Sequence, residues 1–237
     1  MCEIIRIDDN TWRIEDETVR FFLLTGNRSA LMIDTGMHVP HAKAIAEDLT
    51  DLPVRLLNTH ADPDHVSGNA SFGEFLMHPA EWENYHDIHG NDGTLISVHD
   101  GNTIDLGGRT VRLIELPGHT PGSIAVLDEE KRVLFGGDAI QDGRIFMFGS
   151  HRNLIEYIRS LKALAERYGN EFDTIYPSHG TFPVQPELIP KLIKGAEEIL
   201  SGENKGKKVQ VMGRDVQYHD IGCAAFLCEC REEGSNQ

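Results

Sequence analysis

The stretch THADPDHVSG (59–68) is the densest cluster of metal-binding side-chain types in this 237-residue chain. It follows the apolar segment VRLLN (54–58) and places four potential metal ligands within six residues: His60, Asp62, Asp64 and His65. A regular helix or strand would point neighbouring side chains in different directions, whereas a turn can bring them together. Pro63 fixes its own φ and restricts the residue before it, which favours a rigid turn. The stretch therefore predicts a metal site at the end of a strand.

Three further loops each carry one potential ligand after an apolar strand. His119 lies in LPGHTPGS, Asp138 in FGGDA and His179 in YPSHG. Small residues in these loops allow the backbone to bring each side chain toward a shared centre. The alternative is that 59–68 is an ordinary surface turn rich in Asp and His, because short motifs produce false positives. The same arrangement at four strand ends favours the metal site.

Strand patterns cluster in both halves of the chain, with amphipathic helices between them. Alternating apolar residues predict four opening strands, at 3–8, 11–15, 18–25 and 29–34. Helical spacing is found at 41–49 and at 150–169, where Ser150 and Gly169 are the expected caps. We expect two sheets packed together and covered by helices.

The rest of the pattern completes this architecture. In chain order it predicts a polar loop at 59–68, a strand at 75–79, a helix from about 79, a His-rich loop, hairpins at 102–117 and 123–138, a strand at 172–177, a helix at 186–200 and terminal strands at 207–230. No repeat, long linker or low-complexity stretch divides the chain. We therefore expect one domain over 1–237.

Composition limits the classes of partner. The chain has 38 Asp and Glu against 22 Lys and Arg, a formal charge of −16, which argues against nucleic acid and anionic membranes. No secretory signal and no apolar run of roughly 20 residues is visible, so we expect a cytoplasmic protein. The cysteines lie at the two ends of the chain, a poor layout for a disulfide framework, and are expected to be reduced: Cys2, Cys223, Cys228 and Cys230.

Together these motifs resemble the metallo-β-lactamase superfamily, whose pattern is H-x-H-x-D-H followed by a lone His, a lone Asp and a final His. The resemblance runs from the turn IDTG (33–36) to SHG (178–180). It implies an α/β fold, a four-layer αββα sandwich of two mixed β-sheets flanked by helices, with two metals at the open edge between the sheets. It also implies that the first metal is held by His60, Asp62 and His119, the second by Asp64, His65 and His179, and both by Asp138.

Asp62 departs from this pattern, because the family usually has His at that position. A carboxylate adds negative charge and a harder oxygen ligand, which shifts the first site from a pure zinc preference toward manganese or iron. Two divalent ions are expected, with zinc as the first choice and iron or manganese as alternatives. If the short side chain of Asp62 does not reach the first metal, that site would be weak and the enzyme would depend on the second metal.

Metal-assisted hydrolysis is the predicted chemistry. Coordination lowers the pKa of water strongly, toward about 7, so a metal-bound hydroxide would attack an activated ester, thioester, lactone or amide of a small molecule. Asp64 is the expected catalytic residue, orienting the nucleophile and carrying its proton. Two alternatives stay open: an iron-dependent oxidoreductase of oxygen or sulfur compounds on the same fold, and a non-catalytic metal-binding protein. The sequence does not identify the substrate or the oligomeric state.

Six further histidines precede the first hairpin: His38, His41, His78, His86, His89 and His99. Surface or helix-cap positions are the default for each, because imidazole is tolerated in both places. The stretch WENYHDIHGNDG (82–93) is nevertheless expected to form a pocket wall or lid. Phe146 and Phe148 are open to two interpretations, an apolar wall or part of the core.

Overall fold

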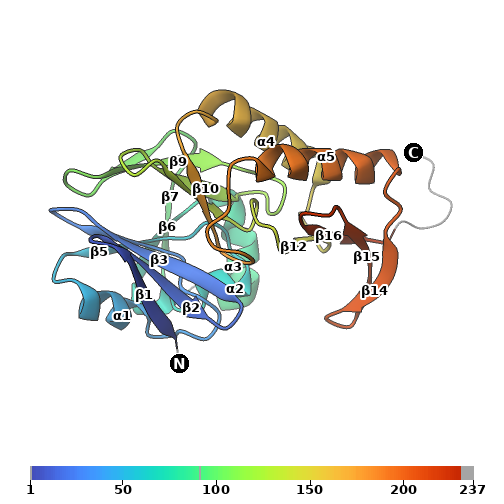
Figure 1. The fold of residues 1–237 in the computed structure, drawn as a ribbon. Coiled ribbons are helices and arrows are strands. Elements are labelled where there is room, and N and C mark those ends of the chain that lie inside the picture. Colours follow the sequence, from blue (N-terminus) through green and yellow to red (C-terminus); the bar gives the residue numbers. More distant parts are fainter. Residues whose placement is uncertain (1, 91, 231–237) are drawn as a thin grey trace.

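Three β-sheets form the framework of the computed structural model, which describes residues 2–90 and 92–230 (Figure 1). The first sheet has seven strands in chain order: β1 (Glu3–Asp8), β2 (Thr11–Asp16), β3 (Val19–Thr25), β4 (Ala30–Ile33), β5 (Val54–Leu57), β6 (Glu74–Met77) and β7 (Thr94–Ser97). Strands β1 to β4 pair antiparallel and β4 to β7 pair parallel, so the sheet is mixed.

The second sheet is also mixed and has five strands. Their order in the sheet is β13 (Thr174–Pro177), β11 (Val133–Gly137), β10 (Ile124–Asp128), β9 (Thr110–Glu115) and β8 (Thr103–Asp105). Only the β11–β13 pair is parallel. Both predicted hairpins are present, as β8–β9 and β10–β11.

Alternation of side chains along β3 explains how the layers pack. Every residue of this strand is buried, because its two faces contact different layers. Phe22 and Leu24 belong to the core between the two sheets, whereas Phe21 and Leu23 belong to the core beneath α1 (Ala42–Leu49) and α3 (Trp82–His89). Helices α4 (Leu154–Tyr168) and α5 (Leu188–Ser201) cover the outer side of the second sheet. The predicted four-layer αββα sandwich is therefore confirmed.

A third, smaller sheet stands beside the sandwich and is absent from the two-sheet prediction. Its order is β12 (Arg144–Met147), β16 (Ala225–Glu229), β15 (Arg214–Asp220) and β14 (Lys207–Val211). Strand β12 pairs parallel with β16, which joins the segment after Asp138 to the C-terminal part of the chain. Figure 1 shows this sheet beneath α5, set apart from the rest of the molecule.

Other differences from the sequence pattern are local. The predicted polar loop at 59–68 contains a short helix, α2 (Pro63–Val66), which begins at the proline because its missing N–H is not needed there. Part of the predicted His-rich loop forms the edge strand β7. The predicted cap Ser150 is wrong: the Asn153 side chain accepts hydrogen bonds from the first turn of α4. The predicted cap Gly169 is confirmed.

The loop that carries His119 packs directly against α4. Gly118 has φ +136°, and a Cβ at this position would lie 2.4 Å from the Tyr157 backbone. Glycine is therefore required for this close approach, which places the His119 loop between the second sheet and the helix. Among the described residues, no helix has the length and apolar character needed to span a bilayer. The cytoplasmic location stays a prediction.

Candidate metal centre

Four loops at the ends of β5, β9, β11 and β13 bring the predicted ligands together. One group, His60, His119 and Asp138, has its ligand atoms within 4.8 Å of one another, as does a second group, Asp64, His65 and His179. Asp138 connects the groups: its Oδ1 lies 3.2 Å from His65 Nε2, and its Oδ2 lies 3.7 Å from His119 Nε2. This is the arrangement expected of a carboxylate that bridges two ions.

Each of the four candidate histidine ligands makes a hydrogen bond through Nδ1. His119 donates to the Phe146 carbonyl, His179 to the Thr18 carbonyl and His65 to Asp34 Oδ2, at 2.7 to 2.9 Å. The Thr59 hydroxyl donates to Asp34, so it accepts from His60 Nδ1 at 3.0 Å. Because these acceptors hold a proton on Nδ1, it is the Nε2 atom of each ring that faces the centre.

The atoms that face the centre have no other polar partner. His60 Nε2, His65 Nε2, His119 Nε2 and Asp138 Oδ1 are buried and make no hydrogen bond of good geometry within the described part of the chain. Buried polar atoms in proteins are normally satisfied, so four in one place call for an explanation. Neutral imidazole nitrogens and carboxylate oxygens are the ligand types of zinc and related divalent metals, so the residues fit a metal centre.

Asp62 reaches the first group despite its short side chain. Its Oδ2 lies 3.2 Å from His119 Nε2 and 3.5 Å from His60 Nε2. All seven predicted ligands are thus brought together, although their binding of metal stays a prediction. The Arg152 guanidinium contacts both oxygens of Asp62, at 2.8 and 2.7 Å, and also donates to the His119 carbonyl at 2.6 Å. A cation therefore occupies the edge of the first group.

The two groups differ in the pKa values of their histidines. Burial alone would lower the pKa of His179, but the nearby carboxylates of Asp138 and Asp64 raise it to about 10. The pKa of His65 is also raised well above its usual range, because the charges of Asp138, Asp64 and Asp34 outweigh burial. In the metal-free protein these carboxylates therefore favour a second proton, on Nε2, in both histidines.

The pKa values of the first group show the opposite behaviour. The pKa of His119 is lowered, mainly by burial and also by the Arg152 charge, against the influence of Asp62. The pKa of Asp62 is held well below its usual range, because contacts with His119 and His60 outweigh the effect of burial. Burial would raise the pKa of Asp138, but the charges of His179 and His65 outweigh this effect. The pKa of Asp138 therefore lies well below its usual range. His119 is therefore neutral and the carboxylates are ionised.

Asp34 supports the centre but was not among the predicted site residues. It accepts hydrogen bonds from the Thr59 backbone and hydroxyl at 2.7 Å and from His65 at 2.8 Å, and it is 1% exposed. Its φ of +65° is left-handed, an uncommon conformation outside glycine. The turn IDTG marked this position in the sequence, but only the fold reveals that its carboxylate orients His65.

Glu81 is a second supporting residue that sequence reasoning missed. Its carboxylate is fully buried and accepts from the Ala61 backbone at 2.9 Å and from the Gly122 backbone at 2.7 Å. Ala61 lies between two predicted ligands, and Gly122 lies in the His119 loop. One side chain therefore ties together two ligand loops that are distant in the sequence.

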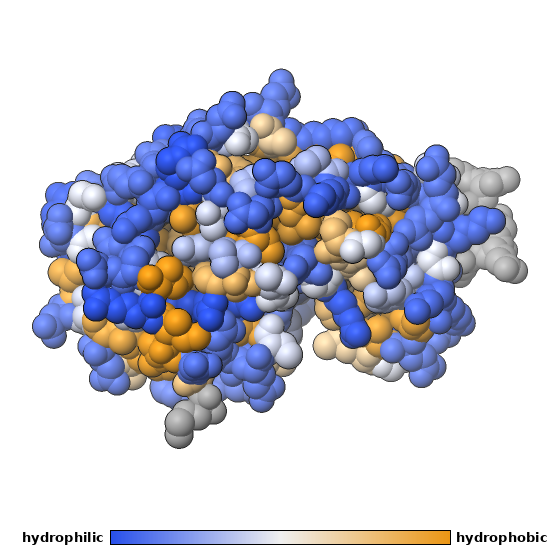
Figure 2. Space-filling model, viewed as in Figure 1, coloured by the Kyte–Doolittle hydropathy of each residue, from blue (hydrophilic) through white to orange (hydrophobic). Residues whose placement is uncertain are grey.

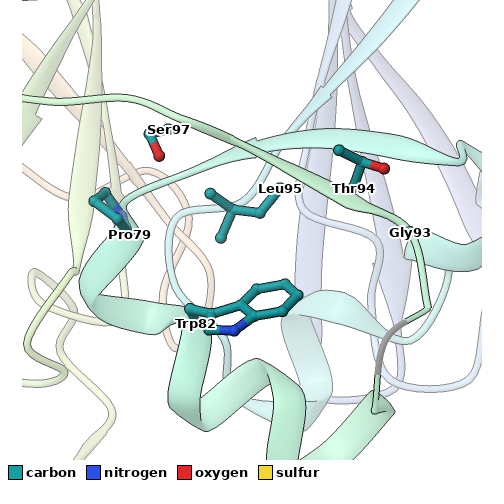
Figure 3. A pocket seen from close by; sticks show the side chains of 6 residues that line it. All are labelled: Pro79, Trp82, Gly93, Thr94, Leu95 and Ser97. Atoms are coloured by element: carbon teal, nitrogen blue, oxygen red, sulfur yellow. The ribbon is translucent and has the colours of Figure 1, made fainter.

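The segment 82–93, which the sequence predicts to be a pocket wall or lid, contacts a candidate ligand through Asn84. Asn84 of α3 donates to Asp62 Oδ1 at 3.4 Å. A pocket of about 510 Å³ opens between α3 and β7, with Trp82 and Leu95 facing each other across it (Figure 3). No predicted ligand lines this pocket. Asn91 lies outside the described residues, and the lid role stays a prediction.

A third group of potential ligands lies away from the centre and consists of His78, His99 and Glu115. His78 Nδ1 accepts from the Ala80 backbone at 3.2 Å, while its Nε2 lies 3.0 Å from Glu115. Because Nδ1 accepts, Nε2 carries the proton and cannot at the same time bind a metal. His78 therefore caps the turn that follows β6, as the default interpretation expected.

Comparison with known proteins identifies the family. The profile of the metallo-beta-lactamase superfamily matches residues 16–179. The chain is 24% identical over 186 residues to acyl-coenzyme A thioesterase MBLAC2 of Homo sapiens (61% of this chain, 66% of the relative). It is 31% identical over 153 residues to hydroxyacylglutathione hydrolase of Prochlorococcus marinus strain MIT 9301 (60% and 59%). The chain thus spans slightly less than two thirds of these curated relatives.

Solved structures share the fold. The metallo-beta-lactamase from Pontibacter korlensis aligns with a TM-score of 0.72 at 17% identity, over 83% of this chain and 99% of that protein. The mono-zinc form of the metallo-beta-lactamase FIM-1 from Pseudomonas aeruginosa aligns with a TM-score of 0.67 at 19% identity, over 84% and 96%. The family profile covers well over half of the sequence, from the second strand to the last predicted ligand, and this chain belongs to the metallo-beta-lactamase superfamily.

Proposed function

We propose that this chain is a metal-dependent hydrolase that cleaves an activated ester, thioester, lactone or amide of a small molecule. The observation that carries the proposal is the convergence of three buried histidine Nε2 atoms and one carboxylate oxygen that lack other partners within the described residues. Two divalent ions would be held, one by His60, Asp62 and His119, one by Asp64, His65 and His179, with Asp138 shared. Zinc is the expected metal.

The names of two relatives support hydrolysis of an acyl compound. One is an acyl-coenzyme A thioesterase and the other a hydroxyacylglutathione hydrolase. Within the proposed range of substrates we therefore favour an acyl ester or thioester. The particular acyl group and leaving group do not follow from these names, because the matched regions are 24% and 31% identical.

The chain's own residues have distinct roles in this chemistry. When bound, the metal ions supply a Lewis acid that polarises the substrate carbonyl and makes water acidic near neutral pH. Asp64, the expected catalytic residue, is more exposed than the shared ligand Asp138, with 31% of its side chain accessible against 6%. Asp64 therefore faces arriving water and substrate, and its carboxylate accepts the proton of the attacking water and returns it to the leaving group. Asp138 stays buried and holds the two halves together.

The structure weakens the argument for iron or manganese at the first group. That alternative depended on the extra negative charge of Asp62, but Arg152 offsets this charge by contacting both carboxylate oxygens. With Arg152 included, His60, Asp62 and His119 carry no net charge, as three histidines would. This charge is that of the family's usual ligand set, for which zinc is expected. A cytoplasmic location and a small-molecule substrate remain part of the proposal.

Elemental analysis of protein purified without added metal tests the proposal, combined with hydrolysis of a panel of acyl esters and thioesters. We expect close to two zinc ions per chain, hydrolysis that is lost with a chelator, and recovery when zinc is restored. Iron as the main metal, with oxygen-linked turnover and no hydrolysis, would support the redox alternative. Bound metal with no turnover of any kind would support the binding protein.

A further inference from the structure

The loop that carries His179 follows an edge strand. Strands β5, β9 and β11, which precede the other ligand loops, each lie between two neighbours, whereas β13 is the last strand of the second sheet. Within the described residues, the outer side of β13 is paired only through the single bridge between Ile175 and Val184. An edge strand leaves backbone groups without partners in the sheet, so the segment 177–180, which we call the His179 loop, depends on contacts from elsewhere.

The hairpin between β2 and β3 supplies these contacts through Arg20, the second residue of β3. The Arg20 backbone N–H donates to the Ser178 carbonyl at 2.9 Å. The Arg20 guanidinium reaches the carbonyls on both sides of this residue: Nη1 donates to Pro177 at 3.2 Å and Nη2 donates to Gly180 at 2.7 Å. Because β3 belongs to the first sheet and β13 to the second, Arg20 joins the two sheets at the His179 loop.

The same hairpin also holds the His179 ring. His179 Nδ1 donates to the carbonyl of Thr18, which lies two residues before Arg20, at 2.7 Å. The other ring nitrogen, Nε2, lies 3.2 Å from Asp64 Oδ2 and 3.3 Å from Asp138 Oδ1. The backbone around His179 and its ring are therefore both fixed to one hairpin, and the direction of Nε2 depends on that hairpin.

The hairpin is itself anchored beside the other histidine of the second group. Asp16 is 6% exposed, and its Oδ2 accepts hydrogen bonds from both backbone N–H groups of the segment 37–38 at 2.7 Å. This segment follows the turn that contains Asp34, whose carboxylate accepts from His65. One hairpin thus connects the turn that orients His65 with the loop that carries His179.

The contacts of Arg20 require a guanidinium. Arg20 is 9% exposed, and a buried charge is costly unless it is paired and hydrogen-bonded. Its Nε lies 3.2 Å from Glu15 Oε1, which leaves Nη1 and Nη2 for the carbonyls of Pro177 and Gly180. Lysine has a single side-chain nitrogen, so it cannot reach acceptors that Arg20 contacts through three separate nitrogens.

Arg13 shares the other neighbours of Arg20 and provides a comparison. Arg13 Nε lies 2.9 Å from Glu15 Oε1, and the guanidiniums of Arg13 and Arg20 lie 4.2 and 5.4 Å from the Phe182 ring centroid. Figure 2 shows hydrophobic side chains at the surface over β1 and β2 next to strongly hydrophilic ones, which agrees with guanidiniums that lie against an aromatic ring. Within the described residues, Arg13 makes no hydrogen bond to the His179 loop. Contact with this loop therefore distinguishes the two arginines.

We propose that Arg20 is a positioning residue that orients His179 as a ligand of the second group, a role that rests on the metal centre of the proposed function. Arg20 contacts neither Asp64 nor Asp138. It fixes the carbonyls around His179, so that Nε2 stays directed at these two carboxylates. Loss of an outer contact of a metal ligand typically lowers metal affinity by about ten- to a hundredfold. Loss of Arg20 should therefore weaken the second group and leave the first unchanged.

Zinc titration with a competing chelator tests this role in Arg20→Met, Arg20→Lys and the matched control Arg13→Met. Loss of one binding step in His179→Gln identifies the step of the second group. We expect both Arg20 variants to lower the zinc affinity of that step by about tenfold or more, and Arg13→Met to keep it within about twofold. Arg20→Lys retains a charge beside Glu15, so it remains informative if Arg20→Met does not fold. Thermal unfolding of each metal-free variant is measured alongside.

Two results of the titration would overturn the proposal. One is a lower melting temperature of the Arg20 variants with an unchanged zinc affinity of the second group, because Arg20 would then only join the two sheets. The other is an equal loss of zinc affinity in Arg13→Met, because the shared neighbours Glu15 and Phe182 would then be responsible rather than the His179 loop. The titration requires no turnover, so it is independent of whether the protein hydrolyses any ester.

Crystal structures of the metal-free variants separate failure of this inference from failure of the proposed function. We expect the hydrogen bond between His179 Nδ1 and the Thr18 carbonyl to be lost in Arg20→Met and retained in Arg13→Met. If the unmodified protein binds no zinc, the proposed function is wrong, but a His179 ring displaced in Arg20→Met alone would still support the positioning role. A ring that keeps its place in Arg20→Met would overturn that role.

Discussion

The two halves of the metal centre have the same number of predicted ligands but opposite electrostatics. His60, Asp62 and His119 lie beside the Arg152 guanidinium, which contacts both oxygens of Asp62. Within the described residues, no Lys or Arg forms an ion pair with Asp64 of the other half or with the shared Asp138. One half thus has its negative charge offset by a cation of the protein, and the other does not.

From this difference we expect the two halves to bind a metal ion unequally. In the half without Arg152, protons on His65 and His179 partly offset the carboxylates, and a metal ion must displace them. In the other half, His119 is already neutral but Arg152 repels an incoming cation. Protons can leave while a guanidinium cannot, so we expect the half formed by Asp64, His65 and His179 to bind metal first and more tightly.

Removing the shared ligand should have the largest effect. Asp138→Ala takes a ligand from both halves, so both ions should be lost or weakened and hydrolysis should fall by about a thousandfold or more. Elemental analysis and the initial rate of hydrolysis measure the two effects. Asp87→Ala on the exposed face of α3 serves as the control and should change neither. Two ions retained in Asp138→Ala would show that the halves are not connected through this carboxylate.

Removing the cation should make the halves more alike. Arg152→Met leaves the charge of Asp62 uncompensated, so zinc affinity of the first half should rise by about tenfold. The affinity of the second half should be nearly unchanged. Zinc titration with a competing chelator resolves both steps, and Arg159→Met, at a 70% exposed side chain, is the control. A weaker first half in Arg152→Met would mean that the guanidinium holds Asp62 and His119 in place rather than opposing the metal.

The protonated histidines predict a pH dependence of the metal-free protein. The folded pKa of His179 is about 10, above the unfolded value of about 6.5. Its contribution to stability is therefore complete below about pH 6.5 and is lost as the pH rises toward the folded value. The melting temperature of the metal-free protein should accordingly fall between pH 7 and 10, and His179→Gln should reduce that fall. Zinc affinity should rise over the same range, since metal binding releases these protons.

Replacing Asp62 should have the smallest effect, because its charge is already compensated. Asp62→His gives the family's usual ligand and should raise zinc relative to iron and manganese in competitive loading. It also leaves Arg152 without its carboxylate partner, so the imidazole and the guanidinium would both be at the same edge. We expect the shift to be larger in the double variant Asp62→His with Arg152→Met. Equal metal ratios in all variants would indicate that position 62 does not contact the metal.

The candidate ligands could be recognised in the sequence because each of the four loops that carry them follows a strand. Apolar runs mark strand ends, and His60, His119, Asp138 and His179 each lie just beyond one. The supporting residues were not predictable in this way. Arg152 and Asp62 are 90 residues apart, and they meet only because the segment after β12 returns to the first ligand loop. Glu81 is likewise an ordinary acidic residue in the sequence, and its role depends on burial beneath two loops.

The strands of the fold were likewise predictable where the sequence has a clear apolar pattern. Long or doubly buried strands such as β3 and β10 have clear apolar patterns. The short edge strands β7 and β12 do not, because much of β7 is exposed and the pairing of β12 depends on the distant strand β16. The third sheet could therefore not be predicted from the sequence, because the pairing of β12 with β16 joins distant segments.

Anomalous diffraction from crystals of the protein loaded with one equivalent of zinc tests the central claim most directly. If the two halves differ as described, the zinc signal will lie among Asp64, His65, His179 and Asp138, and a second signal beside His60 and His119 will appear only with further zinc. A first signal beside His60 and His119 would contradict the account, because the half that contains Arg152 would then be the stronger site. The absence of zinc from both halves would contradict the metal centre itself.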